Sequence, residues 1–234
     1  MNKLILYLIV ALFIGQLQAC TQTNDKTTKM KVTYVMDPQC GWCYGNSANI
    51  TALQEEFKKD FDFELLLGGM WLGQNAPAGG DGLSQFLQNH APRMAATTGA
   101  TVDNSYYELA KDTTYAFSSL EPSAAIKLIK EIAPDKVFTF AKKVQQALFV
   151  EGKRLDQKET YLEILKTMSL DTAIFDSLWM GEDNISKTKA EFTNASNLAN
   201  GFPTLVITKD GKTETLASGY FNKETMIQKL NQLK

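Results

Sequence analysis

The sequence predicts an α/β protein in which a helical insertion separates the two halves of one sheet-containing core. Three observations lead to this fold class. A β-α-β pattern occupies residues 31–67, apolar residues then recur at helical spacing as far as residue 199, and a hairpin followed by a helix closes the chain. With 234 residues, 44% of them hydrophobic, the chain can bury the core of one elaborated domain.

The first twenty residues have the pattern of an export signal. Lys3 supplies positive charge, and the apolar run over residues 4–14 is too short to span a bilayer comfortably. Leu17-Gln18-Ala19-Cys20 resembles the bacterial lipobox, in which the cysteine is lipidated, although Gln18 stands where small residues are usual. We therefore predict a signal peptide over residues 1–19 and lipidation at Cys20. Ordinary signal-peptide cleavage nearby is the alternative.

Residues 20–30 are then a lipidated N-terminus and a polar tether, because residues 21–29 contain no apolar side chain. We expect a monomer at the periplasmic face of a bacterial membrane, anchored through Cys20. Disulfides persist outside the cytoplasm. If Cys20 carries lipid, Cys40 and Cys43 can form a disulfide within the chain only with each other. The net charge of −2 argues against a nucleic-acid partner.

The N-terminal half of the core begins with a strand. Residues 31–36 are β-forming and end at Asp37-Pro38, which predicts a strand boundary. From about Cys43 apolar residues recur at helical spacing, and residues 61–67 form a second strand before Gly68-Gly69. A strand, a helix and a strand in this order predict parallel pairing.

The insertion begins with a loop rich in Gly, Ala and Pro at residues 74–82, and several apolar stripes follow that we interpret as core packing. His90 is the only histidine, and with Pro92 after it we expect it to end a helix rather than to act in catalysis. The stripes cover residues 125–132, 137–148, 161–168, a short helix after Asp171, and residues 182–199.

The C-terminal half of the core begins after Gly201. Two β-rich runs flank Asp210-Gly211, which is a strong hairpin signal, and a helix from about Lys223 follows. The predicted organisation is therefore a core made of residues 31–73 and 200–234, with residues 74–199 as loop and helical insertion.

The segment from Asp37 to Gly45, with the sequence DPQCGWCYG, carries the chemistry we expect. Two thiols two residues apart at a helix start can form a disulfide within one turn, and the helix N-terminus favours the thiolate of the first. Half of a zinc site is the main rival, but three cysteines and one histidine supply too few ligands once Cys20 is lipidated, so we expect no metal. A structural disulfide is the other alternative, although so small a loop constrains the unfolded chain little.

A strand, a C-x-x-C opening a helix and, much later, a proline before a hairpin and a helix resemble the thioredoxin layout. The intervening helices are similar to the insertion of the DsbA family. Within that family, residues 37–45, 147–152 and 200–204 resemble the FrnE-like branch. The resemblance covers about residues 32–230 and implies a thioredoxin-like fold and a protein-disulfide oxidoreductase or isomerase.

The same resemblance implies that the bond before Pro203 is cis and that Pro203 faces the thiol pair as part of the catalytic site. The backbone of Phe202 is then free to pair with an extended substrate segment by strand addition. Met70 and Trp71 are candidates for an apolar groove or for buried core. The predicted substrate-binding residues are Gly41, Trp42, Phe202 and Thr204, and the candidate groove consists of Trp42, Met70, Trp71 and Phe202.

We predict that Cys40 is the nucleophile, because it lies nearest the helix start, and that Cys43 resolves the mixed disulfide. The expected substrates are protein thiols or disulfides, and an unidentified redox partner recycles the pair. No cofactor is needed beyond the Cys40-Cys43 disulfide, which can also exchange with glutathione. Whether the protein acts as an oxidant, a reductant or an isomerase stays open. Gly41-Trp42 lacks the histidine of many DsbA proteins, and Tyr34 stands where relatives commonly have an acid. We expect proton transfer to Cys43 to use water or Asp37, and Asp37 could equally be a turn-former before Pro38.

Two other functions stay open. One is a redox-inert lipoprotein that binds protein segments while Cys40 and Cys43 form a permanent disulfide; a thiol pair at a helix start argues against it. The other is a relative of the glutathione-using kappa transferases and isomerases, which share the helical insertion. Those enzymes characteristically lack the second active-site cysteine, so Cys43 argues against this alternative.

Overall fold

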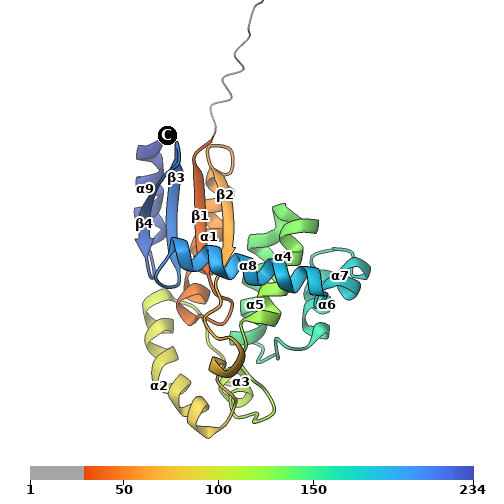
Figure 1. The fold of residues 1–234 in the computed structure, drawn as a ribbon. Helices are drawn as coiled ribbons and strands as arrows, with labels where there is room; N and C mark the ends of the chain where they lie inside the picture. Colours follow the sequence, from red (N-terminus) through yellow and green to blue (C-terminus); the bar gives the residue numbers. More distant parts are fainter. Residues whose placement is uncertain (1–28) are drawn as a thin grey trace, which may run out of the picture.

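The structure is a computed structural model that describes residues 29–234 (Figure 1). The predicted signal peptide and the lipidation at Cys20 lie outside these residues. Within residues 29–234, no helix is long and apolar enough to cross a membrane.

Four strands form one sheet in the order β2-β1-β3-β4. β1 (Lys31–Met36) pairs in parallel with β2 (Asp62–Leu67), and α1 (Gly41–Phe57) connects them, which confirms the predicted β-α-β unit. β3 (Thr204–Lys209) lies antiparallel to β1, and β4 (Lys212–Ser218) pairs with β3. The two halves of the core therefore meet at β1 and β3.

The turn between β3 and β4 follows the Asp-Gly signal. Asp210 and Gly211 have φ angles of 50° and 75°, as a two-residue turn of type I′ requires at both central positions. The terminal helix α9 (Lys223–Leu233) begins at Asn222, whose side chain accepts a hydrogen bond from the Thr225 N–H. The predicted hairpin and terminal helix are both confirmed.

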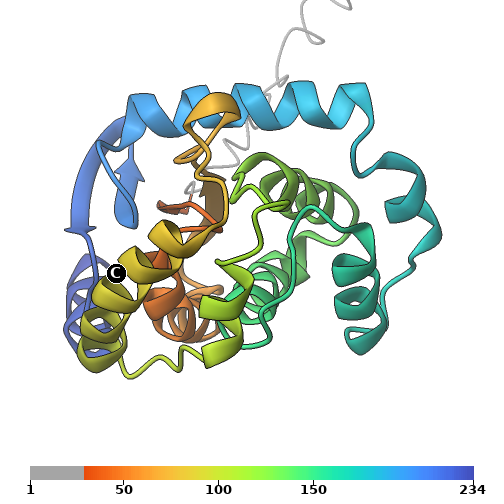
Figure 2. The ribbon, with the colours of Figure 1, turned by 90° about the horizontal axis from the view of Figure 1, so that it is seen from below.

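Helices cover both faces of the sheet (Figures 1 and 2). α1 and α9 lie on one face, and α8 (Glu182–Leu198) crosses the other. Alternate side chains of β1 point to opposite faces of the sheet. Tyr34 and Met36 belong to the main core, whereas Val35 packs with Ala195 of α8.

The remaining helices form a lobe beside and below the sheet (Figure 1). α4 packs against α5 and α8, and α5 packs against α1, so the lobe and the sheet share one hydrophobic cluster. Asn104–Leu109 is a helix that the apolar spacing did not predict. The lobe consists of α2 (Asp81–Thr98), α3 (Asn104–Leu109), α4 (Leu120–Ile132), α5 (Val137–Phe149), α6 (Lys158–Thr167) and α7 (Ala173–Leu178), with short 3-10 turns at Gly73–Asn75 and Pro134–Lys136.

The prediction that a helix ends near His90 is wrong, because α2 continues through Pro92 to Thr98. Proline removes one backbone donor and disfavours a helix interior. Here Ala91 and Met94 are buried on either side of it, and this packing keeps the helix on the core. The helix ends before Gly99, whose φ of 74° is the left-handed conformation typical of a helix C-terminus.

A partly buried ion pair joins α4 and α8 to the end of β2. Lys130 Nζ donates to Glu191 Oε1 at 2.6 Å and to the Leu65 carbonyl at 2.6 Å. Glu191 Oε1 also accepts the Leu67 N–H at 3.0 Å. These bonds satisfy backbone groups on the outer edge of β2, directly before the loop that enters the candidate site.

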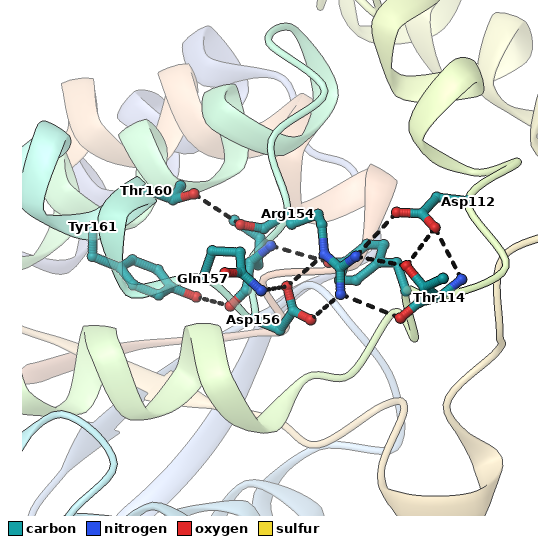
Figure 3. A network of polar contacts seen from close by, with 9 residues as sticks. Asp112, Thr114, Arg154, Asp156, Gln157, Thr160 and Tyr161 are labelled. Atoms are coloured by element: carbon teal, nitrogen blue, oxygen red, sulfur yellow. Dashed lines mark hydrogen bonds and ion pairs between the residues drawn. The ribbon is translucent and has the colours of Figure 1, made fainter.

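A polar network fixes the loop before α6 to the loop after α3 (Figure 3). The Arg154 guanidinium donates to Asp156 at 2.6 Å, to Asp112 at 3.1 Å and to Thr114 Oγ1 at 2.9 Å. It also lies 5.1 Å from the centre of the Tyr115 ring. Because two carboxylates already pair with Arg154, this residue stabilises the lobe and is not an anion-binding site.

Candidate active site

Cys40 and Cys43 lie where β1 gives way to α1. Cys40 is the N-cap residue with extended backbone angles (φ −77°, ψ 117°), and its carbonyl accepts the Tyr44 N–H at 3.0 Å. Both cysteines are free thiols. Cys40 is 7% exposed and Cys43 is fully buried, so Cys40 is the more accessible of the two sulfurs.

The two thiols differ in acidity. The pKa of Cys40 is lowered, chiefly by a hydrogen bond from the Cys43 thiol and further by the backbone N–H groups of Cys43 and Trp42, while burial and Asp37 oppose this effect. The pKa of Cys43 is raised well above its ordinary value, chiefly by burial and then by its bond to Cys40. The thiolate is therefore favoured on Cys40 and the proton on Cys43.

The loop before β3 faces the thiol pair. The Phe202–Pro203 peptide bond is cis, as the resemblance implies. Cys40 Sγ lies 3.7 Å from the Phe202 carbonyl oxygen, and Thr204 Oγ1 donates to the Gly201 carbonyl at 2.8 Å. The structure thus brings Cys40, Cys43 and the 202–204 segment together.

Gly68 and Gly69 make room for this loop, and the site prediction did not include them. A Cβ atom at Gly68 would lie 2.1 Å from Cζ of Phe202, and one at Gly69 would lie 2.9 Å from Cδ2 of Phe192. No side chain larger than hydrogen fits at either position without displacing an aromatic ring. The signal in the sequence is a Gly-Gly pair directly after a strand, which indicates close approach of another segment.

An apolar cavity of about 260 Å³ opens beside Cys40. Trp42, Met70 and Trp71 line it and are half-buried, so Met70 and Trp71 belong to the cavity wall rather than to the closed core. The opposite wall comes from the helical lobe. It includes Phe86, Leu87, His90 and Met94 of α2, Tyr106 of α3 and Phe149 of α5.

Phe202 does not line that cavity, so the expected single groove is divided. Phe202 lines a second cavity of about 430 Å³ together with Leu72, Phe192 and Asn200. The loop of residues 68–72 separates the two cavities, because Met70 and Trp71 line the first and Gly69 and Leu72 line the second. The contact between Cys40 and Phe202 lies between the two cavities.

Asp37 is fully buried beside the thiols. Its Oδ1 accepts the Gln39 N–H at 2.8 Å and the Ser119 hydroxyl at 3.0 Å, and its Oδ2 accepts the Met70 N–H at 2.7 Å. Burial raises the pKa of Asp37 to about 6. Ser119 was absent from the predicted site, because a serine before an apolar stripe indicates a helix cap and not a partner 82 residues away.

Tyr34 and His90 are two further polar side chains near the thiol pair. The Tyr34 hydroxyl donates to the Cys43 carbonyl at 3.4 Å, and burial raises its pKa well above the ordinary value, so it is neutral at pH 7. The exposed His90 ring stacks on Phe86 at 4.1 Å, and its Nδ1 lies 2.7 Å from the Phe86 carbonyl. Among residues 29–234, no three His, Cys, Asp or Glu side chains are grouped so that they could hold a metal ion.

A sequence model of the thioredoxin family matches residues 33–225, which is most of the chain. The chain belongs to the thioredoxin family. It is a DsbA-like member of the thioredoxin superfamily, and the solved structures similar to it include thiol-disulfide enzymes. No curated protein matches it in sequence.

Solved structures support this thioredoxin assignment. The cytosolic disulfide reductase DsbM from Pseudomonas aeruginosa is 27% identical with a TM-score of 0.72, covering 87% of this chain and 100% of DsbM. The same reductase with GSH gives 28% identity, a TM-score of 0.72 and coverage of 87% and 98%. A candidate protein disulfide isomerase from Nitrosomonas europaea has a TM-score of 0.75 over 87% of this chain and 97% of its own, and at 20% identity it shows the fold alone.

Proposed function

We propose that the protein is an exported thiol-disulfide oxidoreductase that acts on protein thiols and disulfides through Cys40 and Cys43. One observation carries the proposal: the more acidic, more accessible thiol lies 3.7 Å from the Phe202 carbonyl, between two cavities. A reactive sulfur beside a free backbone segment suits a reaction with a cysteine in an extended polypeptide. Membership of a thiol-disulfide enzyme family supports it.

In the oxidising direction, a substrate thiolate attacks the Cys40 sulfur of the Cys40–Cys43 disulfide. The bond between the two cysteines breaks, and Cys43 leaves as a thiolate that takes up a proton because its pKa is high. A second substrate thiolate attacks the substrate sulfur of the mixed disulfide, and Cys40 leaves as a thiolate. Two substrate thiols become one disulfide, the cysteine pair takes two electrons, and a disulfide of the redox partner reoxidises it.

In the reducing direction the same steps run backwards. The Cys40 thiolate attacks a substrate disulfide, one substrate sulfur leaves, and Cys43 then attacks Cys40 to release the second. The pair ends as a disulfide and the substrate gains two electrons and two protons. In both directions the mixed disulfide forms at Cys40, which is the attacked sulfur in oxidation and the nucleophile in reduction. Cys43 is the leaving thiolate in oxidation and the resolving thiol in reduction. The greater exposure and acidity of Cys40 support this assignment.

The walls of the site favour a polypeptide substrate. Pro203 has no N–H, so the Phe202 backbone is the group next to Cys40 that can pair with an extended segment. The cavity beside Cys40, about 260 Å³, is smaller than the roughly 300 Å³ at which small-molecule pockets begin, and it suits one bulky apolar side chain. Gly41 and Trp42 adjoin Cys40 on this wall.

A second candidate is a disulfide reductase that uses glutathione, because the similar DsbM was solved with GSH. Glutathione carries two carboxylates, which lysine or arginine would ordinarily bind. The cavity beside Cys40 is lined by neither. This lining favours protein substrates, with glutathione exchange as a side reaction.

Export and membrane attachment rest on the N-terminal sequence. We propose that residues 1–19 direct export and that lipid on Cys20 holds the protein at a membrane, with residues 20–30 as tether. DsbM is described as cytosolic, so its similarity supplies no location. Labelling with a radioactive fatty acid tests the anchor, and a Cys20→Ala variant that keeps the label would overturn it.

Reduction of a disulfide-bonded peptide by the reduced protein tests the function. The wild-type protein and a Cys43→Ser variant should both cleave the peptide once, and a Cys40→Ser variant should not. A Cys40→Ser variant that cleaves at the wild-type rate would move the nucleophile elsewhere. No cleavage by any of the three proteins would favour the redox-inert binding module.

A further inference from the structure

The carboxylate of Asp37 joins three segments around the thiol pair. Gln39, which donates to it, precedes Cys40; Met70 belongs to the loop that separates the two cavities; and Ser119 is the residue at which α4 begins. One side chain therefore connects the redox loop, a cavity wall and the helical lobe.

Neighbouring hydrogen bonds close the same junction. Ser119 and Trp71 bond twice, through the Ser119 N–H to the Trp71 carbonyl at 2.8 Å and the Trp71 N–H to the Ser119 hydroxyl oxygen at 3.1 Å. The Gln39 side-chain amide donates to the Ser118 carbonyl at 2.9 Å. The Asp37 carbonyl accepts the Cys40 N–H at 3.1 Å, so Asp37 fixes the nucleophile's own backbone as well.

No cation offsets this carboxylate, since Asp37 forms no ion pair with any residue from 29 to 234. Burying a carboxylate that has hydrogen bonds but no paired cation costs free energy. A residue that only formed a turn would not need to be buried in this way. Its negative charge disfavours the thiolates of Cys40 and Cys43. The titratable groups on which the charge of Asp37 acts are Cys40 and Cys43 at the start of α1, and the loop of residues 68–72 carries none. On α4, Glu121 lies in the first turn, and the cations Lys127 and Lys130 further along pair with Glu131 and Glu191.

We propose that Asp37 is a positioning residue of the redox site, which holds the 68–72 loop and the start of α4 against Cys40 and, when charged, makes Cys40 a weaker acid. The inference rests on the proposed function, because it concerns the same thiol pair. Burial raises the pKa of Asp37 to about 6, so the carboxyl is neutral in mildly acidic surroundings and charged at pH 7. The pKa of Cys40 is then lower when Asp37 is neutral, below about pH 6, than when Asp37 is charged, above it.

The test is the rate at which iodoacetamide alkylates Cys40 in the reduced full-length protein between pH 4 and 10, with Cys40 and Cys43 peptides separated by mass. Asp37→Asn should lower the pKa of Cys40 and speed alkylation roughly three- to tenfold above about pH 6, where wild-type Asp37 is charged, at pH values at which Cys40 is still largely protonated. Asp62→Asn is the matched control, because Asp62 is exposed at the far end of β2. An Asp37→Asn profile that coincides with the wild type overturns the proposal.

Ser119→Ala supplies a second variant that keeps the charge and removes one donor to it. The wild-type profile should bend near pH 6, Ser119→Ala should move the bend to higher pH, and Asp37→Asn should have none. If Asp37→Asn does not fold, the bend and its shift in Ser119→Ala still decide the matter. A profile without a bend in the wild type contradicts the charge effect.

Alkylation needs no substrate, so this test is independent of the proposed function. A protein that responds to Asp37→Asn but exchanges no disulfides would refute the oxidoreductase and retain the role of Asp37 towards the thiols. Active disulfide exchange without any response to Asp37→Asn would refute the inference alone.

Discussion

Cys40 and Phe202 are 162 positions apart in the sequence, and the sulfur of one lies 3.7 Å from the carbonyl oxygen of the other. The parallel β1–β2 unit carries Cys40, and the antiparallel pairing of β3 with β1 brings Phe202 to the same end of the sheet. The sheet topology therefore brings together the Cys40 thiol and the Phe202 backbone from the two halves of the chain. Of the two cysteines at this place, Cys40 is the more exposed.

The difference in burial between the thiols predicts which variant traps substrates. Cys43→Ser should accumulate mixed disulfides between Cys40 and client proteins, because no resolving thiol is left to release them. Non-reducing gels followed by mass spectrometry of the conjugates measure this. Cys40→Ser is the control, and trapping by Cys40→Ser in place of Cys43→Ser would reverse the assignment.

The close approach of Phe202 to Gly68 predicts a steric defect. Gly68→Ala should destabilise the fold by about 1–3 kcal/mol and slow disulfide exchange, because its Cβ would meet the Phe202 ring. Gly82→Ala, where a Cβ has nothing within 4 Å, is the matched control and should be neutral or slightly stabilising in α2. Denaturant unfolding and peptide reduction measure both effects, and equal stability of the two variants would count against this packing.

The cavity beside Cys40 predicts a preference for apolar neighbours of the substrate cysteine. Phe86 is 50% exposed and lines the cavity, so Phe86→Ser should raise the KM for peptides with an aromatic residue beside cysteine several-fold and leave kcat nearly unchanged. Ile174→Ser on α7 removes a similarly exposed apolar side chain (45%) away from the cavity. An equal effect of both variants, or none for aromatic peptides, would exclude the cavity as a substrate site.

Asp37 predicts a pH dependence of stability. Its pKa in the folded protein, about 6, lies above the ordinary value of 3.8, so folding favours the protonated form. Its stabilising contribution is complete below about pH 4 and falls by about 3 kcal/mol as the pH rises through 6. Denaturant unfolding of wild type and Asp37→Asn at pH 4 and 7.5 should show the wild type losing stability relative to the variant. A difference that does not change with pH would contradict the shifted pKa.

Local pattern predicted much of this fold, because strands and turns are encoded by neighbouring residues. The alternation in residues 31–36 and the Asp210-Gly211 turn both lie where expected. Pro92 misled the prediction, since the burial of residues on either side of it outweighs its helix-breaking tendency. Packing against a distant core is not visible in a local window.

The candidate site was predictable where a motif was contiguous and not where it depended on side chains from distant segments. Cys40, Cys43 and Pro203 belong to the short sequence motifs on which the family resemblance rests. The bond between Asp37 and Ser119 depends on how the helical lobe docks, so no spacing in the sequence reveals it. The division of the groove likewise follows from the path of residues 68–72 between two cavities.

The central claim is that Cys40 and Cys43 exchange reversibly between dithiol and disulfide. The most direct measurement equilibrates the protein in graded glutathione buffers, traps free thiols by alkylation and reads the oxidised fraction by mass. We expect a single two-electron transition whose midpoint lies between those of thioredoxin and DsbA, roughly −270 to −120 mV. A pair that stays fully oxidised or fully reduced at every poise would contradict it.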